Sequence, residues 1–281
     1  MAYLIYNKQI LRAETPCISP QDRGFTLGHG LFETLLFNEN SFPAFDYHWQ
    51  RLAASAPLLG IILPFSRFEL ETMLNELMKV NTLENQLAGA RVTITHGDSA
   101  RGLVPAEPTT PNFLITSFAH DWMANRPFSA LIVNTRKNEH SLSARIKSIS
   151  ALDNILAKQE AKREGYDEAI LLNSKNQVAD GAMTNIYLVK DKQILTPPLE
   201  DGALPGVIRS ILLQEFQHKL AISEQSISVA MVLAAKEVFL SNALLGVQPL
   251  RQINNTQKLD YSTAQHISNL LNKEKNYGFA L

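Results

Sequence analysis

Residues 119–127 form a polar, proline-containing segment that we interpret as a linker between two domains. Before this segment, strand-like and helical stretches are mixed. The strand-like ones lie near 3–11, 31–37, 90–97 and 111–118, and the helical ones at 45–60 and 65–80. After it, strands and helices continue to alternate through residue 276. We therefore predict two domains that each contain helices and strands (α+β or α/β), at 1–118 and 128–281.

Composition supports two folded domains and argues against some partners. The 281 residues are 45% hydrophobic and 19% charged, which is enough apolar material for buried cores. The 26 basic and 27 acidic residues nearly cancel, and no basic tract stands out. We therefore expect no nucleic-acid partner, because binding to phosphate backbones needs clustered positive charge.

Cysteine and hydropathy patterns indicate the compartment. The one cysteine, Cys17, has no partner for a disulfide, and no Cys/His spacing fits a zinc site, so we expect no metal. The N-terminal MAYLIYNKQI is too short an apolar run for a signal peptide, and no run is long enough to span a bilayer. We expect a soluble, cytoplasmic protein.

Lys147 occupies an unusual local setting. It lies between Ile146 and Ile149, just before a helix that Ser150 and Asp153 are expected to open through an S-x-x-D pattern. Burial among isoleucines and a nearby positive helix terminus both lower the pKa of a lysine, which makes its amine a better nucleophile. A surface lysine whose ammonium reaches water is the simpler interpretation, and local sequence leaves both open.

Several motifs in order along the chain carry a resemblance to a known family. They are DRGFTLGHGLFET at 22–34, HWQRL at 48–52, IKSISALDNILAKQEA at 146–161, VADGAMTNIYLV at 178–189 and LPGVIR at 204–209, followed by FLSNALLGVQP at 239–249. Together they resemble the class-IV aminotransferases, the pyridoxal-phosphate enzymes of fold type IV. Each short motif is weak by itself, and the specificity comes from their order and separation.

The resemblance implies an architecture and partners. It implies the D-amino-acid aminotransferase-like fold, with a smaller N-terminal α+β domain and a larger C-terminal domain containing a barrel-like sheet. It also implies pyridoxal 5'-phosphate as cofactor, a small-molecule substrate and a homodimer.

The resemblance also assigns roles to residues. Lys147 matches the Schiff-base lysine, Arg51 the arginine that grips the cofactor phosphate, and Asp180 the acid facing the pyridine nitrogen. Physical chemistry agrees, because a phosphate suits a guanidinium and a protonated pyridine nitrogen needs a carboxylate. The helix expected at 206–220 would offer the backbone N–H groups of Gly206, Val207 and Ile208 to the phosphate.

The chain departs from the family pattern at three positions. Asp180 stands where glutamate is usual, Ile208 replaces a common threonine, and Ala151 stands near where many relatives have a tyrosine. The residue that takes over the tyrosine's role is not evident from the sequence.

The departures point toward the lyase branch of the family. Asn242 and Ala243 stand where aminotransferases carry a G-T or S-T pair, and HGDSARGL at 96–103 is similar to a lyase loop. We therefore expect an aminodeoxychorismate lyase that releases pyruvate and forms p-aminobenzoate. Arg101 is the expected substrate-carboxylate ligand, and Thr34 is expected to assist proton transfer. The alternatives are an aminotransferase for branched-chain or D-amino acids and a non-catalytic cofactor-binding or scaffold protein.

Overall fold

Two units of structure make up the chain by their internal contacts. The computed structural model describes residues 2–15, 17–105, 108, 110–120, 126–275 and 277. The first unit comprises Met1–Asp121 with Lys147–Ser150, and the second comprises Trp122–Ile146 with Ala151–Leu281. The expected linker at 119–127 spans the division, although residues 121–125 lie outside the described part of the chain.

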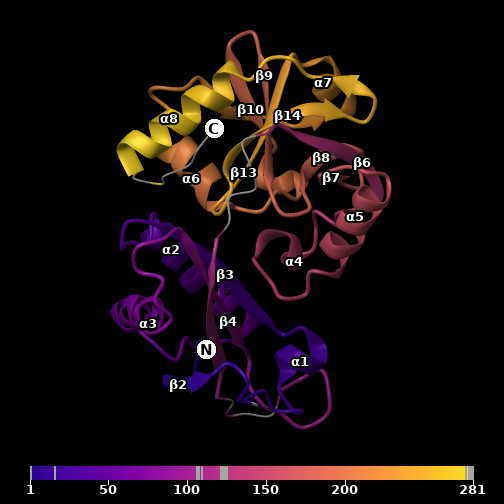
Figure 1. Ribbon diagram of the computed structural model, residues 1–281. Coiled ribbons are helices and arrows are strands. Elements are labelled where there is room, and N and C mark those ends of the chain that lie inside the picture. The colour runs from indigo at the N-terminus through magenta and orange to yellow at the C-terminus, as the bar shows by residue number, and fades with distance from the viewer. Residues whose placement is uncertain are drawn as a thin grey trace. The chain divides into compact units, whose positions relative to one another are not determined.

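The first unit is built on an antiparallel five-stranded sheet (Figure 1). Its strands are β1 (Tyr3–Tyr6), β2 (Gln9–Arg12), β3 (Gly30–Phe37), β4 (Ala88–Thr95) and β5 (Asn112–Ala119), in the spatial order β2-β1-β5-β4-β3. The helical segments are α1 (Arg23–Leu27), α2 (Phe45–Ser55), the short 3-10 helix η1 (Pro57–Leu59) and α3 (Arg67–Val80). Helix α2 packs on β3, and α3 packs on β1 and β5.

Alternation along the strands gives this sheet one buried face and one half-buried face. Leu31, Glu33 and Leu35 of β3 are buried, whereas Phe32 and Thr34 between them are only partly covered. Strand β4 follows the same rule, because successive side chains point to opposite faces. A capping box begins α3: Ser66 accepts from the Glu69 amide, and the Glu69 side chain accepts from the Ser66 amide.

A short segment around Lys147 extends the sheet at its β3 edge. The Phe32 amide donates to the Lys147 carbonyl at 2.9 Å, and the Ile149 amide donates to the Gly30 carbonyl at 3.1 Å. Leu31 and Ser148 form an antiparallel bridge between these bonds. This pairing corrects the expected division, which placed all of 128–281 in the second domain. Residues 147–150 belong to the first unit because their backbone completes its edge.

The second unit contains a ten-stranded mixed sheet. Its strands are β6 (Phe128–Arg136), β7 (Glu168–Leu172), β8 (Gln177–Gly181), β9 (Asn185–Lys190), β10 (Gln193–Thr196), β11 (Ile222–Glu224), β12 (Ile227–Ser228), β13 (Glu237–Asn242), β14 (Gly246–Ile253) and β15 (Thr256–Gln257). The path begins at β11 and ends at β12, with β15 pairing beside β14. Only Gln225 and Ser226 separate β11 from β12 in sequence, so the two edges of the path come together and the sheet is barrel-like.

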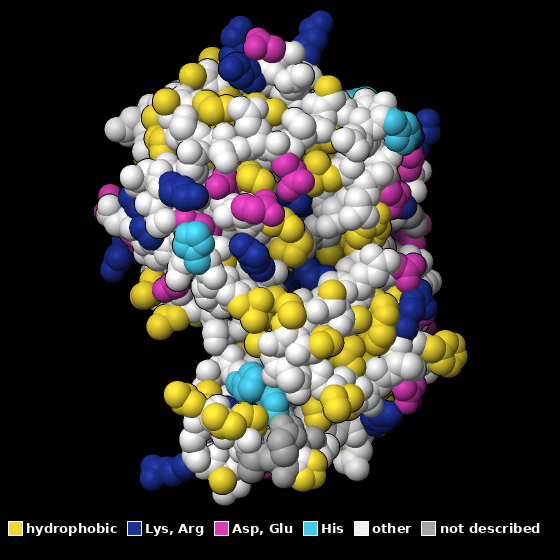
Figure 2. All heavy atoms as spheres, turned by 180° about the vertical axis from the view of Figure 1, so that it is seen from behind, with side chains coloured by type: hydrophobic (Ala, Val, Ile, Leu, Met, Phe, Trp, Pro, Cys, Tyr) yellow, Lys and Arg dark blue, Asp and Glu magenta, His cyan; other side chains and the backbone are white. Residues whose placement is uncertain are grey.

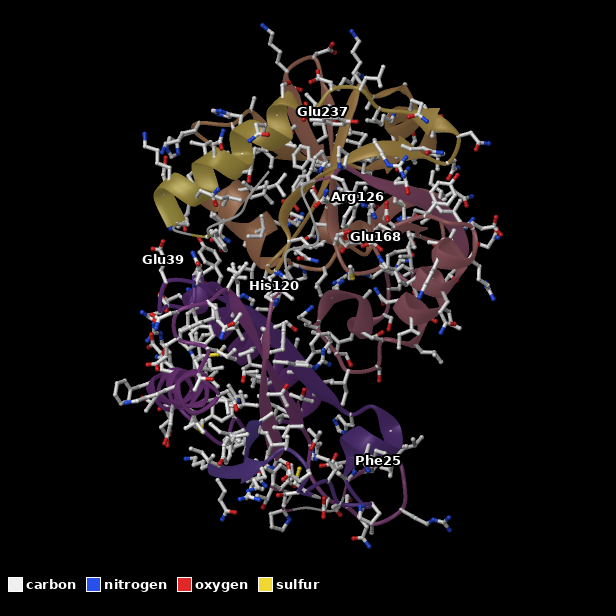
Figure 3. The ribbon with its side chains drawn as sticks, in the orientation of Figure 1. Phe25, Glu39, His120, Arg126, Glu168 and Glu237 are labelled. Atoms are coloured by element: carbon white, nitrogen blue, oxygen red, sulfur yellow. The ribbon has the colours of Figure 1, made fainter. Side chains whose placement is uncertain are left out.

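Helices cover this sheet. They are α4 (Leu142–Arg145), α5 (Leu152–Arg163), η2 (Leu199–Asp201), α6 (Val207–Gln214), α7 (Val229–Ala234) and α8 (Ser262–Lys275). Helix α5 packs on β6 and β7, α6 on β11 and β13, and α8 on β14. The buried Glu237 at the start of β13, labelled in Figure 3, accepts the amides of Thr263 and Ala264 and so fixes the first turn of α8.

Two details of the expected helices were wrong. Helix α6 ends at Gln214, not at residue 220, because turns after it carry Phe216 and Leu220 into the core and lead into β11. Ser150 does not cap α5, which begins after Ala151 without a side-chain cap. The Ser150 hydroxyl instead donates to the Gly28 carbonyl at 2.9 Å and secures the edge segment.

Gly30→Ala tests the edge pairing. An added Cβ would lie 2.4 Å from the Ile94 carbonyl oxygen and 2.9 Å from Ile149 Cδ1. We expect a loss of about 1–3 kcal/mol in the free energy of unfolding from overpacking. We also expect faster hydrogen exchange at the Phe32 and Ile149 amides. As a control, Gly165→Ala meets nothing within 4 Å and carries only the strain of a positive φ, so it should leave those two amides protected. Equal protection in both variants would contradict the edge role.

Candidate active site

A buried ionic cluster joins β3 to α2 in the first unit. Arg51 donates from Nε to Glu33 Oε1 at 2.8 Å and from Nη2 to Glu33 Oε2 at 2.6 Å. His48 Nδ1 lies 2.6 Å from the same Oε2. The Nε/Nη2 side of Arg51 is thus held by Glu33 through two charge-assisted hydrogen bonds.

The charges of this cluster follow from its burial. Burial by itself would raise the pKa of Glu33, but the charge and hydrogen bonds of Arg51 and the bond to His48 lower it to about 2. Burial also lowers the pKa of His48, so the imidazole is neutral at pH 7 and donates from Nδ1 to the carboxylate. The cluster therefore holds the Arg51 side chain of α2 in one orientation.

Lys147 points to the half-buried face of the same sheet. Its Nζ lies 4.4 Å from the centroid of the Phe32 ring, and Arg91 Cζ lies 3.9 Å from that centroid. Two cations thus flank one aromatic ring, whose negative faces attract them. Burial lowers the pKa of Arg91, which has no ion pair with a carboxylate within the described part of the chain.

Thr34 stands directly across the strand pair from Arg91. Residues opposite each other in an antiparallel pair share a face, so the Thr34 hydroxyl and the Arg91 guanidinium are neighbours on the lysine-bearing face. Sequence reasoning missed Arg91. The available signal was a lone arginine in the strand ARVTIT, where a charge is out of place unless it serves a site or an ion pair.

Arg101 lies on a loop rather than on the strands that carry Thr34 and Arg91. It is exposed on the loop that follows β4. Among the described residues, no hydrogen bond or ion pair joins its side chain to Lys147, Thr34 or Arg91. The expected substrate role of Arg101 thus depends on how that loop is held.

Asp180 lies in the second unit, at the end of β8, and is buried. Its carboxylate accepts from the Leu204 amide at 2.9 Å and from Asn185 Nδ2 at 3.2 Å, and Lys137 Nζ lies 3.9 Å from Oδ2. Burial raises the pKa of Asp180 to about 6, although Lys137 and the amides oppose the rise. A carboxyl group with this pKa can share a proton with a basic ring nitrogen near neutral pH.

The turn that follows Asp180 is rigidly held. The Gly181 amide donates to the Thr184 carbonyl at 2.8 Å, and Thr184 Oγ1 donates to the buried Glu168, labelled in Figure 3. Lys158 pairs with Glu168 at 3.0 Å. This support fixes the direction of the Asp180 side chain.

Helix α6 begins next to Asp180 without a capping side chain. Its N-cap is Gly206, and the N–H groups of Val207 and Ile208 in the first turn have no intrahelical acceptors. A Cβ on Gly206 would lie 1.8 Å from Asn185 Oδ1, so only glycine fits. Asn185 Nδ2 also donates to the Leu204 carbonyl at 2.8 Å, which ties this helix start to the acid.

Asn242 closes its own turn between β13 and β14. Its Oδ1 accepts the amides of Leu244 and Leu245, at 3.0 and 2.7 Å, and its Nδ2 donates to the Met183 carbonyl at 3.3 Å. The expected contribution of Asn242 and Ala243 to cofactor binding is thus confined to the backbone of this turn and to the Nδ2 group.

The expected residues therefore fall into two groups. The first unit holds Lys147, Arg51, Thr34 and Arg101, and the second holds Asp180, Gly206, Val207, Ile208, Asn242 and Ala243. The donor set fits pyridoxal phosphate: an amine, a guanidinium, a buried acid with raised pKa, and the first-turn N–H groups of a helix that begins at a glycine.

The visible surface carries charges of both signs. On the face shown in Figure 2, basic and acidic side chains are interspersed. Within the described residues, no helix is long and apolar enough to cross a membrane, and no cluster of three or more His, Cys, Asp or Glu is placed to hold a metal ion.

Comparison with known proteins places this geometry in a family. The family model described as amino-transferase class IV matches residues 30–253. Aminodeoxychorismate lyase of Bacillus subtilis is 28% identical over 254 residues, covering 89% of this chain and 86% of that protein. D-alanine aminotransferase of Bacillus licheniformis is 27% identical over 252 residues, covering 89% of this chain and 88% of that protein.

Solved structures share the fold. A putative 4-amino-4-deoxychorismate lyase from Legionella pneumophila has a TM-score of 0.87 at 27% identity, covering 93% of this chain and 96% of its own. The branched-chain amino acid aminotransferase of Escherichia coli has a TM-score of 0.90 at 22% identity, covering 98% and 94%. The two-domain fold expected from the motifs is confirmed. The chain belongs to the class IV aminotransferases, a family of pyridoxal-phosphate enzymes.

Proposed function

We propose that this protein is a pyridoxal-phosphate-dependent lyase that converts 4-amino-4-deoxychorismate to p-aminobenzoate and pyruvate. The observation that carries the proposal is the half-buried face of the first unit's sheet. There Lys147 and Arg91 flank Phe32, Thr34 lies opposite Arg91, and no carboxylate pairs with Arg91 in the described residues. Such a face suits a substrate that carries two carboxylates.

In this proposal, some residues hold the cofactor and others bind the substrate. Arg51, the N–H groups of Val207 and Ile208, and the Ala243 turn would hold the cofactor phosphate. Asp180 would share a proton with the pyridine nitrogen. Bound pyridoxal phosphate supplies an electron sink for the carbon that carries the substrate's amine. Arg91 and Arg101 would bind the two carboxylates and orient that carbon toward Lys147.

The proposed bond changes balance without a further reactant. The Lys147 amine takes the proton from the amine-bearing ring carbon, and the C–O bond to the enolpyruvyl group breaks. The enolpyruvyl oxygen leaves with the bonding electrons as the enolate of pyruvate, which becomes pyruvate when its methylene carbon takes up one proton. Thr34 is the nearby hydroxyl that can relay this proton. The ring becomes aromatic, which makes the reaction strongly favourable. No amino group is transferred to another molecule.

An aminotransferase acting on D-amino acids or branched-chain amino acids is the second candidate. It is favoured by relatives named D-alanine aminotransferase, which match nearly as well as those named aminodeoxychorismate lyase. A non-catalytic cofactor-binding protein or scaffold is the candidate from another class. Both predict that aminodeoxychorismate is left unchanged.

The chain is also proposed to act as a homodimer. Leu152, Ile155 and Leu156 of α5 recur at helical spacing and are exposed, whereas Ala157 and Ala161 are buried. The exposed Met183 adjoins these exposed residues, because Asn154 of α5 donates to the carbonyl of its neighbour Ala182. An apolar surface of this kind fits a second copy of the chain. Sedimentation velocity showing only monomer would contradict this.

The lyase proposal is tested by a coupled assay. Purified, cofactor-loaded protein is incubated with 4-amino-4-deoxychorismate, and pyruvate is followed through lactate dehydrogenase. We expect pyruvate and p-aminobenzoate in equal amounts. In a parallel arm the protein receives D- or branched-chain amino acids with 2-oxo acids. Rapid conversion of the cofactor to its pyridoxamine form in that arm, with no pyruvate in the first, would replace the lyase by the aminotransferase.

Asp180→Asn should weaken cofactor binding while raising the stability of the cofactor-free protein at alkaline pH. A carboxyl group whose pKa is raised by folding stabilises the fold below its unfolded pKa of 3.8, and that contribution is lost as pH rises through about 6. The cofactor-free Asn variant should therefore be more stable than the parent at pH 8, by about 1–3 kcal/mol, with the gap closing near pH 4. It should also bind pyridoxal phosphate more weakly. Urea unfolding at both pH values and cofactor titration measure these effects; a gap that is the same at both pH values would contradict the burial of a costly charge.

A further inference from the structure

The loop that follows β4 is held by the segment just before α1. The Arg23 amide donates to the Gly97 carbonyl at 2.9 Å, and the Ser99 amide donates to the Gln21 carbonyl at 3.3 Å. Asp22 and Asp98 form an antiparallel bridge between them. These bonds fix the first half of the loop, residues 97–99, through its backbone.

The second half of the loop is held by one side chain. Arg23 is buried, and its Nη1 donates to the Gly102 carbonyl at 2.9 Å while Nη2 donates to the Leu103 carbonyl at 2.5 Å. Its Nε donates to His29 Nδ1 at 3.2 Å. No carboxylate pairs with Arg23 in the described residues, since the neighbouring Asp22 accepts from Thr95, Asn112 and the start of α1. Burying a guanidinium is costly, and here two of its three bonds go to consecutive loop carbonyls.

Apolar packing does not hold this part of the loop. Leu103 and Val104 are 85% and 84% exposed, and Gly102 has a φ of +132°. Phe25 on α1, labelled in Figure 3, is also exposed. The loop conformation therefore depends on backbone bonds, and beyond residue 99 the described bonds come from Arg23.

His29 anchors Arg23 in turn. Because His29 Nδ1 accepts from Arg23, its Nε2 carries the hydrogen and donates to the Leu59 carbonyl at 2.9 Å, at the end of η1. The His29 ring also stacks on His96, the first residue after β4, at 4.4 Å between centroids. Arg23 is thus connected both to the base of the loop and to the segment that follows α2.

Arg101 sits between the two anchored parts of the loop, immediately before Gly102. We propose that Arg23 is a positioning residue, which fixes the loop backbone so that Arg101 presents its guanidinium to a carboxylate of the substrate. This rests on the proposed function, in which Arg101 binds that carboxylate. Without Arg23 the loop would sample many conformations, and the substrate would have to order it on binding.

The experiment compares Arg23→Gln with Arg23→Lys in the full cofactor-loaded chain. Hydrogen exchange of the 97–104 loop is measured without substrate, and kcat and KM are measured for aminodeoxychorismate. We expect Arg23→Gln to speed loop exchange and to raise KM about 10–100-fold, the size expected for losing one charged hydrogen bond, with kcat changed less than about 3-fold. Arg23→Lys, which keeps the charge and can reach one carbonyl, should recover part of both effects. Exposed Arg12 supplies the control Arg12→Gln, which should change neither.

A double variant separates positioning from general stability. If Arg23 acts through Arg101, then Arg23→Gln combined with Arg101→Ala should raise KM no more than Arg101→Ala alone. Additive effects, or fast loop exchange with an unchanged KM, would overturn the proposal. So would unchanged loop exchange in Arg23→Gln. If the wild-type chain releases no pyruvate, the proposed lyase function is refuted. The hydrogen-exchange data would still show whether Arg23 holds the loop. KM would then be measured for the carboxylate substrate that the chain turns over.

Discussion

A short antiparallel pairing between residues 30–32 and 147–149 determines where the chemistry of the first unit takes place. Two backbone hydrogen bonds and the Ser150–Gly28 contact attach the lysine segment to the edge of β3. Because residues opposite each other share a face, the pairing directs Lys147 to the side of Phe32. Gly30 permits the close approach, and any side chain there would press on Ile94 and Ile149. The same strand, on its other face, carries the glutamate that orients Arg51.

Two buried carboxyl groups, those of Glu33 and Asp180, have opposite pKa shifts because their surroundings differ. Glu33 has Arg51 and His48 within hydrogen-bond distance, and its pKa falls to about 2. Asp180 has amide donors and a lysine 3.9 Å away, and burial raises its pKa to about 6. Glu33 is therefore a permanent anion that holds an arginine in place. Asp180 is poised to exchange or share a proton, as a partner of a pyridine nitrogen must be.

Much of the fold could be predicted from the sequence because local patterns and tertiary structure agree there. The strand at 31–37 and the α3 capping box follow from alternation and side-chain capping, and the ordered motifs indicated the family. Long-range pairing could not be predicted. Ser150 looks like a helix cap but bonds Gly28, more than 100 residues earlier, and Lys147 joins a sheet formed almost entirely by residues before 121.

Site residues divide in the same way. Lys147, Arg51 and Asp180 lie in recognisable motifs. Arg91 is a single charged residue in a strand, and it stands out only once the structure shows that it pairs with Thr34 on the neighbouring strand and contacts the Phe32 ring. Leu152, Ile155 and Leu156 recur at helical spacing and are exposed, whereas the small Ala157 and Ala161 of the same helix are buried. Periodicity identifies an apolar face without saying which partner covers it.

Replacement of Lys147 by alanine tests most directly whether this lysine performs the reaction. The account predicts that the wild-type protein with pyridoxal phosphate shows a near-visible absorbance band and releases pyruvate from aminodeoxychorismate. Lys147→Ala should lose the band and slow pyruvate release by at least about 100-fold, the usual contribution of a positioned acid–base group. The exposed Lys162→Ala should change neither. Pyruvate release at the wild-type rate by Lys147→Ala, with the band retained, would contradict the account.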